Sequence, residues 1–223
     1  MTAALDSKLE SVRRHAAEAL GRIGTASAPA VPKLVTRLHD EDPVVRIHAA
    51  LALWQIARHE KALPTLVAAL HQDAAAASYD AAMALGELGP DAQPAVADLV
   101  QALSHADADT ARAAALALGR VGTAAIPALK TVLVQSNPLR QCRAIEALEG
   151  IGPETAPLLI ESLADRDPAV RRTAARALGR FGPAAQGAVA PLMQTASDPI
   201  EQVRQEAARA LRRIGTVAVE VKP

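Results

Sequence analysis

The chain has 223 residues, of which 50% are hydrophobic but only 1% are aromatic, so alanine and leucine supply most of its apolar content. This composition favours closely packed helices and argues against a β-sandwich, because sheets prefer β-branched and aromatic residues. The formal net charge is zero, yet residues 1–111 carry a charge of −5 and residues 112–223 a charge of +5. We therefore expect one acidic end and one basic end.

The single cysteine, Cys142, excludes a disulfide framework and a Cys-x-x-Cys metal site within the chain. The first residues lack the basic region and long apolar run of a signal peptide. No apolar stretch approaches the roughly 18 residues that a transmembrane helix needs. We therefore expect a cytoplasmic protein with no membrane partner, unless it was excised from a longer exported protein.

One sequence pattern recurs seven times along the chain. In its sixth copy it reads DRDPAVRRTAARALGRFG, from Asp165 to Gly182. The leucine of its Ala-Leu-Gly centre recurs at intervals of 30 to 33 residues, at Leu20, Leu53, Leu85, Leu118, Leu148, Leu178 and Leu211. A fixed period of this size predicts an array of stacked structural repeats.

Each copy predicts two helical segments. In the first segment, apolar residues fall eight, four and one positions before the motif leucine and three after it, which places them on one side of a helix. In chain order these segments begin at Glu10, Asp42, Ala77, Asp109, Leu139, Asp165 and Glu201. Six of them end at a glycine where we expect a left-handed C-terminal cap: Gly24, Gly89, Gly122, Gly152, Gly182 and Gly215.

Proline marks the starts of both kinds of segment. Asp42-Pro43, Asp167-Pro168, Asp198-Pro199 and Asn137-Pro138 each predict an N-cap followed by proline at the first helical position. The second segments begin near Pro32, Pro64, Pro94, Pro127, Pro157 and Pro191. One helix pair in about 32 residues, with short turns, predicts an α-α solenoid.

The pattern DPxVRxxAAxALGxIG, followed by a proline-initiated helix, resembles HEAT repeats, in particular the short subclass first noted in phycobilin lyases. The resemblance covers nearly the whole chain and implies an all-α, right-handed superhelix of about six to seven helical hairpins, with residues 1–223 as a single domain. The tail from Thr216 resembles the start of another second helix. We therefore expect a fragment of a longer array, or ends covered by another copy or a partner.

An arginine stands seven positions before the motif leucine in four copies, as Arg13, Arg46, Arg171 and Arg204. It resembles the Asp-Arg ladder of HEAT arrays, in which the arginine lies close to the aspartate of the turn between repeats; a phosphate contact is the alternative. The third to fifth copies carry Ser78, Ala111 and Gln141 at this position, so we expect the ladder to be broken in the middle.

Four positions of the first segment, six, five and two before the leucine and two after it, are predicted to share a face opposite the core. In HEAT proteins this face lines the concave surface. In the second to fourth copies it is apolar, with Ile47, Leu51, Tyr79, Met83 and Leu116. Aromatic and methionine side chains are favoured at interface hot spots, so we predict a partner-binding patch there. The alternative is burial of these residues between loosely packed helices.

In the fifth to seventh copies the same face is predicted to carry Arg143, Arg172, Arg176, Arg180, Arg209 and Arg213. Such a stripe suits an acidic protein surface or nucleic-acid phosphates, and a solvated arginine-rich face is the alternative. Zero net charge and the scarcity of aromatic residues for base stacking argue against nucleic acid. We therefore predict a non-catalytic scaffold that binds an acidic, partly apolar protein or peptide segment on its concave face; a purely structural spacer is another alternative.

An enzyme remains the alternative of a different class. The segment RRHAAEALG, from Arg13 to Gly21, resembles the histidine repeats of deoxyhypusine hydroxylase, a di-iron HEAT enzyme. That family needs His-Glu pairs in several repeats, whereas this chain has one, at His59-Glu60 in a turn. His15, His48 and Asp80 do share one position in successive copies. The sequence contains no glycine-rich phosphate loop or nucleophile motif. We expect no catalytic residue, no metal site and no cofactor, although a hydroxylase-like or lyase-like enzyme or enzyme subunit stays open.

Overall fold

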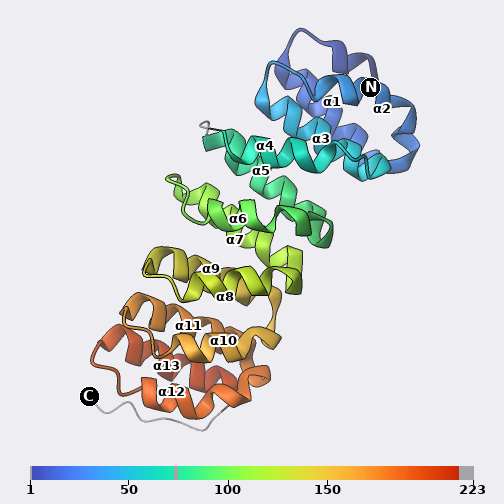
Figure 1. Ribbon diagram of the computed structural model, residues 1–223. Coiled ribbons are helices and arrows are strands. Elements are labelled where there is room, and N and C mark those ends of the chain that lie inside the picture. Colours follow the sequence, from blue (N-terminus) through green and yellow to red (C-terminus); the bar gives the residue numbers. More distant parts are fainter. Residues whose placement is uncertain (1, 73–74, 216–223) are drawn as a thin grey trace. The chain divides into compact units, whose positions relative to one another are not determined.

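A computed structural model describes residues 2–72 and 75–215, which form α-helices and 3-10 helices and contain no strand (Figure 1). This confirms the predicted all-α fold. The contacts divide the chain into two compact units, residues 1–117 and 118–223, with the boundary inside helix α7. The predicted tail helix from Thr216 lies outside the described residues, and a single domain over residues 1–223 stays a prediction.

The first unit holds the motif helices of the first three copies and most of the fourth. Its elements are η1 (Thr2–Asp6), α1 (Glu10–Ile23), η2 (Gly24–Ala30), α2 (Val31–Arg37), α3 (Pro43–Ala57), α4 (Ala62–Leu70), α5 (Ala75–Leu88), η3 (Gly89–Ala95), α6 (Val96–Ala102) and the first part of α7 (Ala108–Val121). Motif helix α3 packs against α1 on one side and α5 on the other, while α2 and α4 pack alongside it (Figure 1).

The second unit repeats this arrangement. Its elements after α7 are η4 (Gly122–Ala125), α8 (Ile126–Leu133), α9 (Pro138–Ile151), η5 (Pro153–Thr155), α10 (Ala156–Ser162), α11 (Pro168–Phe181), η6 (Gly182–Ala188), α12 (Val189–Thr195) and α13 (Glu201–Ile214). Motif helix α11 packs between α9 and α13, with α10 and α12 alongside. The described residues therefore contain the seven motif helices and the six intervening helices that the period predicts.

The motif leucines form the centre of the core in both units. Each is buried, with Leu20 the most exposed at 4% and Leu178 fully buried. The residues four positions before them, from Ala16 to Ala207, are buried as well. The small alanine side chain lets neighbouring helices approach closely, while the leucine fills the space between them. The structure therefore confirms the face that the spacing assigned to the core.

The motif glycines end their helices with positive φ angles at all six predicted positions. Gly215 adopts the predicted left-handed cap, with φ 96° and ψ 21°. Gly24 and Gly182 do not, because their ψ angles of −141° and −138° lie in a region that only glycine adopts readily. In the second copy, which has no glycine here, Arg58 takes the left-handed position and stacks over the ring of Trp54 at 3.5 Å.

Three of the four predicted N-caps are confirmed. The side chains of Asp42, Asn137 and Asp167 accept hydrogen bonds from backbone amides in the first turns of α3, α9 and α11. The prediction for Asp198-Pro199 is wrong. Helix α13 begins only at Glu201, its N-cap residue is Ile200, and the side chain of Ile200 forms no capping hydrogen bond. The carboxylate of Asp198 instead accepts hydrogen bonds from the guanidinium of Arg171 and from the backbone amide of Ile200.

The aspartate-arginine ladder is present at two matching positions. Arg13 donates from Nε and Nη2 to the two carboxylate oxygens of Asp40, at 2.8 and 2.7 Å. Arg171 contacts Asp198 in the same way, at 2.7 and 2.9 Å. The predicted break in the middle is only partial, because the amide of Gln141 still donates to Asp165 at 2.9 Å. A neutral amide thus replaces the guanidinium without losing the contact between repeats.

One apolar run departs from the sequence prediction. Residues 108–133, comprising α7, η4 and α8, are long enough to cross a membrane, and an 18-residue window within them is apolar enough by composition, with a mean hydropathy of 1.3. The backbone turns at Gly122, where φ is 84°, so the run is two helices of one repeat rather than one straight rod. Leu118, Val121 and Leu129 along it are buried in the protein core.

Candidate binding pocket between α5 and α7

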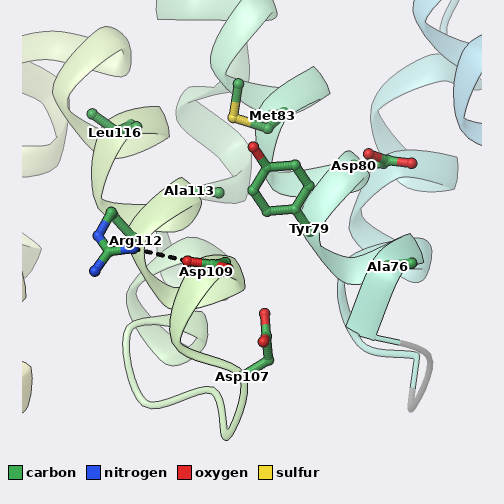
Figure 2. Close-up of a pocket in the computed structure, with 9 residues that line it drawn as sticks. All are labelled: Ala76, Tyr79, Asp80, Met83, Asp107, Asp109, Arg112, Ala113 and Leu116. Carbon is green, nitrogen blue, oxygen red and sulfur yellow. Dashed lines mark hydrogen bonds and ion pairs between the residues drawn. The ribbon is translucent and has the colours of Figure 1, made fainter.

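The first unit contains an open pocket of about 590 Å³ between α5 and α7 (Figure 2). It includes three of the five apolar residues that the sequence predicts for partner binding, Tyr79, Met83 and Leu116. The full lining comprises Ala76, Tyr79, Asp80, Met83, Asp107, Asp109, Arg112, Ala113 and Leu116.

Helical spacing explains why these side chains meet. Tyr79 and Met83 are four residues apart on α5, and Arg112 and Leu116 are four apart on α7, so each pair lies on one side of its helix. The motif leucines of both helices point to the core on other sides. Figure 2 shows the ring of Tyr79 and the side chain of Met83 on the side of α5 that faces α7.

The apolar side chains of the pocket are accessible. Tyr79 is 38% exposed and Leu116 is 55% exposed, and Met83 is half-buried. Burial between loosely packed helices was the alternative for these residues, and the exposure of Tyr79 and Leu116 argues against it. Exposed apolar side chains gathered around one concavity are typical of interaction sites.

Ile47 and Leu51 do not belong to this pocket. Ile47 is only 2% exposed, so it lies in the core rather than on a binding face, because α3 is packed on both sides by α1 and α5. Leu51 is half-buried and lines a separate space of about 80 Å³ next to His48 and Glu87. The predicted apolar patch is therefore narrower than the sequence indicated.

Charged groups surround the apolar part of the pocket. Arg112 donates from Nη1 to Asp109 at 2.8 Å, and both side chains are exposed (Figure 2). Asp107 accepts hydrogen bonds from the amide and hydroxyl of Thr110, which lower the pKa of its carboxyl group. Partial burial raises the pKa of Asp80, although the charges of His48 and Arg14 act in the opposite direction.

A comparison with known protein families identifies the family to which the chain belongs. The sequence profile of the family described as HEAT repeats matches residues 1–86, 75–149, 96–166 and 156–221. The chain belongs to the HEAT-repeat family. No curated protein matches the sequence.

Several solved structures are similar to this HEAT-repeat chain. The complex of CpcE and CpcF of phycocyanin lyase from Nostoc sp. PCC7120 is 27% identical, with 97% of this chain and 93% of that chain covered and a TM-score of 0.48. Human deoxyhypusine hydroxylase in complex with glycerol is 25% identical, with 96% and 82% covered and a TM-score of 0.44. An engineered protein is 26% identical, with 96% and 67% covered and a TM-score of 0.49.

The histidines of the HEAT repeats do not gather into a metal-binding group. Among residues 2–72 and 75–215, no three or more histidine, cysteine, aspartate or glutamate side chains lie where they could hold a metal ion. His15 is exposed, whereas His48 is half-buried and burial lowers its pKa. The position of His48 and Asp80, five before the leucine, borders the core because it lies one helical turn before a buried alanine. This position is therefore less open than the sequence predicts, although Asp80 still lines the pocket between α5 and α7 and His48 lines the small space beside Leu51.

The predicted arginine stripe of the second unit is largely matched by glutamates. Arg176 pairs with Glu146 at 3.2 Å, Arg180 pairs with Glu149, and Arg209 pairs with Glu206 at 3.2 Å on the same helix. Arg172 donates to the amide oxygen of Gln202 at 3.1 Å, and Arg213 is exposed.

Arg143 is another correction, because it is only 8% exposed and so lies inside the packing rather than on the predicted face. The pairing of these arginines with glutamates was not predicted from the sequence. Glu146 and Glu149 precede Arg176 and Arg180 by 30 and 31 residues, close to one repeat period. This spacing of one repeat is the feature of the sequence from which the pairs could have been predicted.

Cys142 lies on α9 beside Thr173 of α11. It is half-buried, its sulfur lies 3.5 Å from the hydroxyl of Thr173, and burial raises the pKa of its thiol. A raised pKa lowers the fraction of reactive thiolate at neutral pH.

Proposed function

We propose that this HEAT-repeat chain is a non-catalytic scaffold that binds a protein or peptide segment at the pocket between α5 and α7. The observation that carries the proposal is the exposure of Leu116 and Tyr79 around a concavity of about 590 Å³. Removing one large apolar side chain from water contributes about 1.5–3 kcal/mol, so a partner that covers both gains substantial free energy.

The arginine face of the second unit gives weaker support for an acidic partner. Exposed charges that already have a neighbouring glutamate gain little when they exchange one ion pair for another. Among the described residues, Arg172 and Arg213 are the exposed arginines of that face that form no ion pair with a carboxylate, and they are the groups through which an acidic segment would bind.

Site-specific photocrosslinking tests the proposal. A benzophenone amino acid replaces Leu116 in one version of the full chain and Leu139 in another, in the cells that naturally produce the protein. Leu139 is a matched control, because it is also an exposed leucine of a motif helix, at 65% against 55% for Leu116. We expect a discrete crosslinked polypeptide from position 116 and not from position 139.

A second variant connects the crosslink to the pocket. Replacing Tyr79 by serine in the chain that carries the photocrosslinker at position 116 should reduce the yield several-fold, because Tyr79 faces the same space. Equal products from positions 116 and 139, or none from either, would contradict binding at this pocket. Melting temperatures of the three versions establish that each is folded.

A further inference from the structure

We infer that the segment bound in this pocket presents a bulky apolar side chain next to a lysine or arginine, and is therefore basic rather than acidic. This inference rests on the proposed function and specifies its partner. It replaces, for the first unit, the acidic partner that the arginines of the second unit suggest.

The apolar part of the pocket calls for an apolar anchor. Tyr79, Met83 and Leu116 offer carbon and sulfur surface from two facing helices. Its volume of about 590 Å³ lies within the range of roughly 300–1,000 Å³ that is usual for ligand sites. Methionine adapts its shape to different partners, so leucine, methionine or phenylalanine would each fit here.

The charges of the pocket call for a cation. Its lining contains the carboxylates of Asp80, Asp107 and Asp109 and the guanidinium of Arg112, a formal charge of −2. Arg112 is already paired with Asp109 at 2.8 Å. Asp80 has a half-buried carboxylate, and burial has raised its pKa, so a cation placed beside it would relieve part of the cost of its charge.

Tyr79 adds a preference for a cation over a neutral polar group. A lysine or arginine over the face of an aromatic ring gains cation-π attraction, and Figure 2 shows Tyr79 between Met83 and the carboxylates of Asp107 and Asp109. The same chain contains such a contact elsewhere, since the guanidinium of Arg58 stacks 3.5 Å from the centre of the Trp54 ring.

The neighbouring surface of the first unit has the same sign. In the small space beside Leu51, Glu18 is paired with Arg22 at 2.8 Å, whereas Glu87 accepts a hydrogen bond from the neutral amide of Gln55. Residues 1–111 together carry a charge of −5. An acidic segment would therefore meet like charge at the pocket and along its approach.

Selection from a random linear peptide library tests the inference. The full chain is the bait, and peptides that also bind a Leu116→Ser variant are discarded. The enriched peptides are then synthesised, and their affinities are measured for the wild type, Asp80→Asn and Glu60→Gln at low and high salt. Glu60 is the matched control, because it is an exposed carboxylate of the first unit in the turn between α3 and α4.

We expect enriched peptides to combine an apolar residue with lysine or arginine. Asp80→Asn should weaken them about two- to fivefold, as expected for one charge pair at a solvent-accessible site, and Glu60→Gln should leave them unchanged. Peptides that require Leu116 but carry acidic residues or no charge would overturn the inference and leave the proposed function intact. Failure to find any peptide that requires Leu116 would overturn both.

Discussion

The guanidinium of Arg171 forms two parallel hydrogen bonds with the carboxylate of Asp198, at 2.7 and 2.9 Å, and thereby ties the start of α11 to the turn before α13. Both side chains are largely buried, at 13% and 7% exposure. Asp198→Asn should lower the free energy of unfolding by about 1–3 kcal/mol, because a buried charged donor loses its partner. Asp109→Asn, in the exposed pair with Arg112, should cost less than about 1 kcal/mol. Urea denaturation of both variants measures the difference, and equal losses would contradict the assignment.

Low pH should remove the same contribution. The hydrogen bonds from Arg171 hold the pKa of Asp198 below its usual 3.8, although burial opposes them. A carboxyl with a lowered folded pKa stabilises the protein above its unfolded pKa, and this stability is lost as pH falls through the folded value. The stability difference between wild type and Asp198→Asn should therefore be constant near neutral pH and shrink below about pH 4. A difference that grew on acidification would contradict this sign.

The glycine after the motif leucine should matter through close helix packing. A Cβ at Gly179 would lie 2.8 Å from Cα of Ala210 and 2.9 Å from its Cβ, so α11 and α13 would have to separate. We expect Gly179→Ala to cost about 1–3 kcal/mol, as overpacking usually does. Gly187→Ala is the matched control, because no atom lies within 4 Å of its added Cβ. Thermal melts that rank Gly187→Ala as the more damaging change would show that this packing is wrong.

Core substitutions should follow burial rather than side-chain size. The sequence alone gives Phe181→Ala a cost of about 3–5 kcal/mol if Phe181 is buried. The structure leaves Phe181 half-buried, whereas Leu178 is fully buried. We therefore expect Leu178→Ala to cost about 2–5 kcal/mol and Phe181→Ala less. Chemical denaturation of the two variants checks this order.

The repeat period was sufficient to predict the helices and their core. A motif leucine such as Leu178 is buried because every copy presents the same apolar stripe to its neighbours, so one pattern read seven times fixes the packing. For the same reason, the sequence could predict that Tyr79, Met83 and Leu116 lie on one face. Tyr79 and Met83 are one helical turn apart, and Leu116 occupies the motif position of Met83 in the next copy.

The features that could not be predicted from the sequence depend on contacts between successive copies of the repeat. Ile47 is buried by two flanking helices, which no property of its own helix indicates. The pairing of Arg176 with Glu146 joins residues 30 apart, and a count of arginines on one face overlooks it. The acidic lining of the pocket was missed because Asp107 and Asp109 precede or begin their helix, outside the four positions assigned to the open face.

Methionine methyl NMR tests the proposed pocket most directly. The chain has three methionines, of which Met83 lines the pocket and Met193 is an exposed residue of the second unit. A Met83→Leu variant assigns the signal, and the partner segment found by crosslinking is titrated into ¹³C-methyl-labelled protein. We predict that the Met83 resonance shifts in proportion to binding while that of Met193 stays in place. A bound segment that leaves Met83 unshifted, or shifts Met193 instead, would contradict binding between α5 and α7.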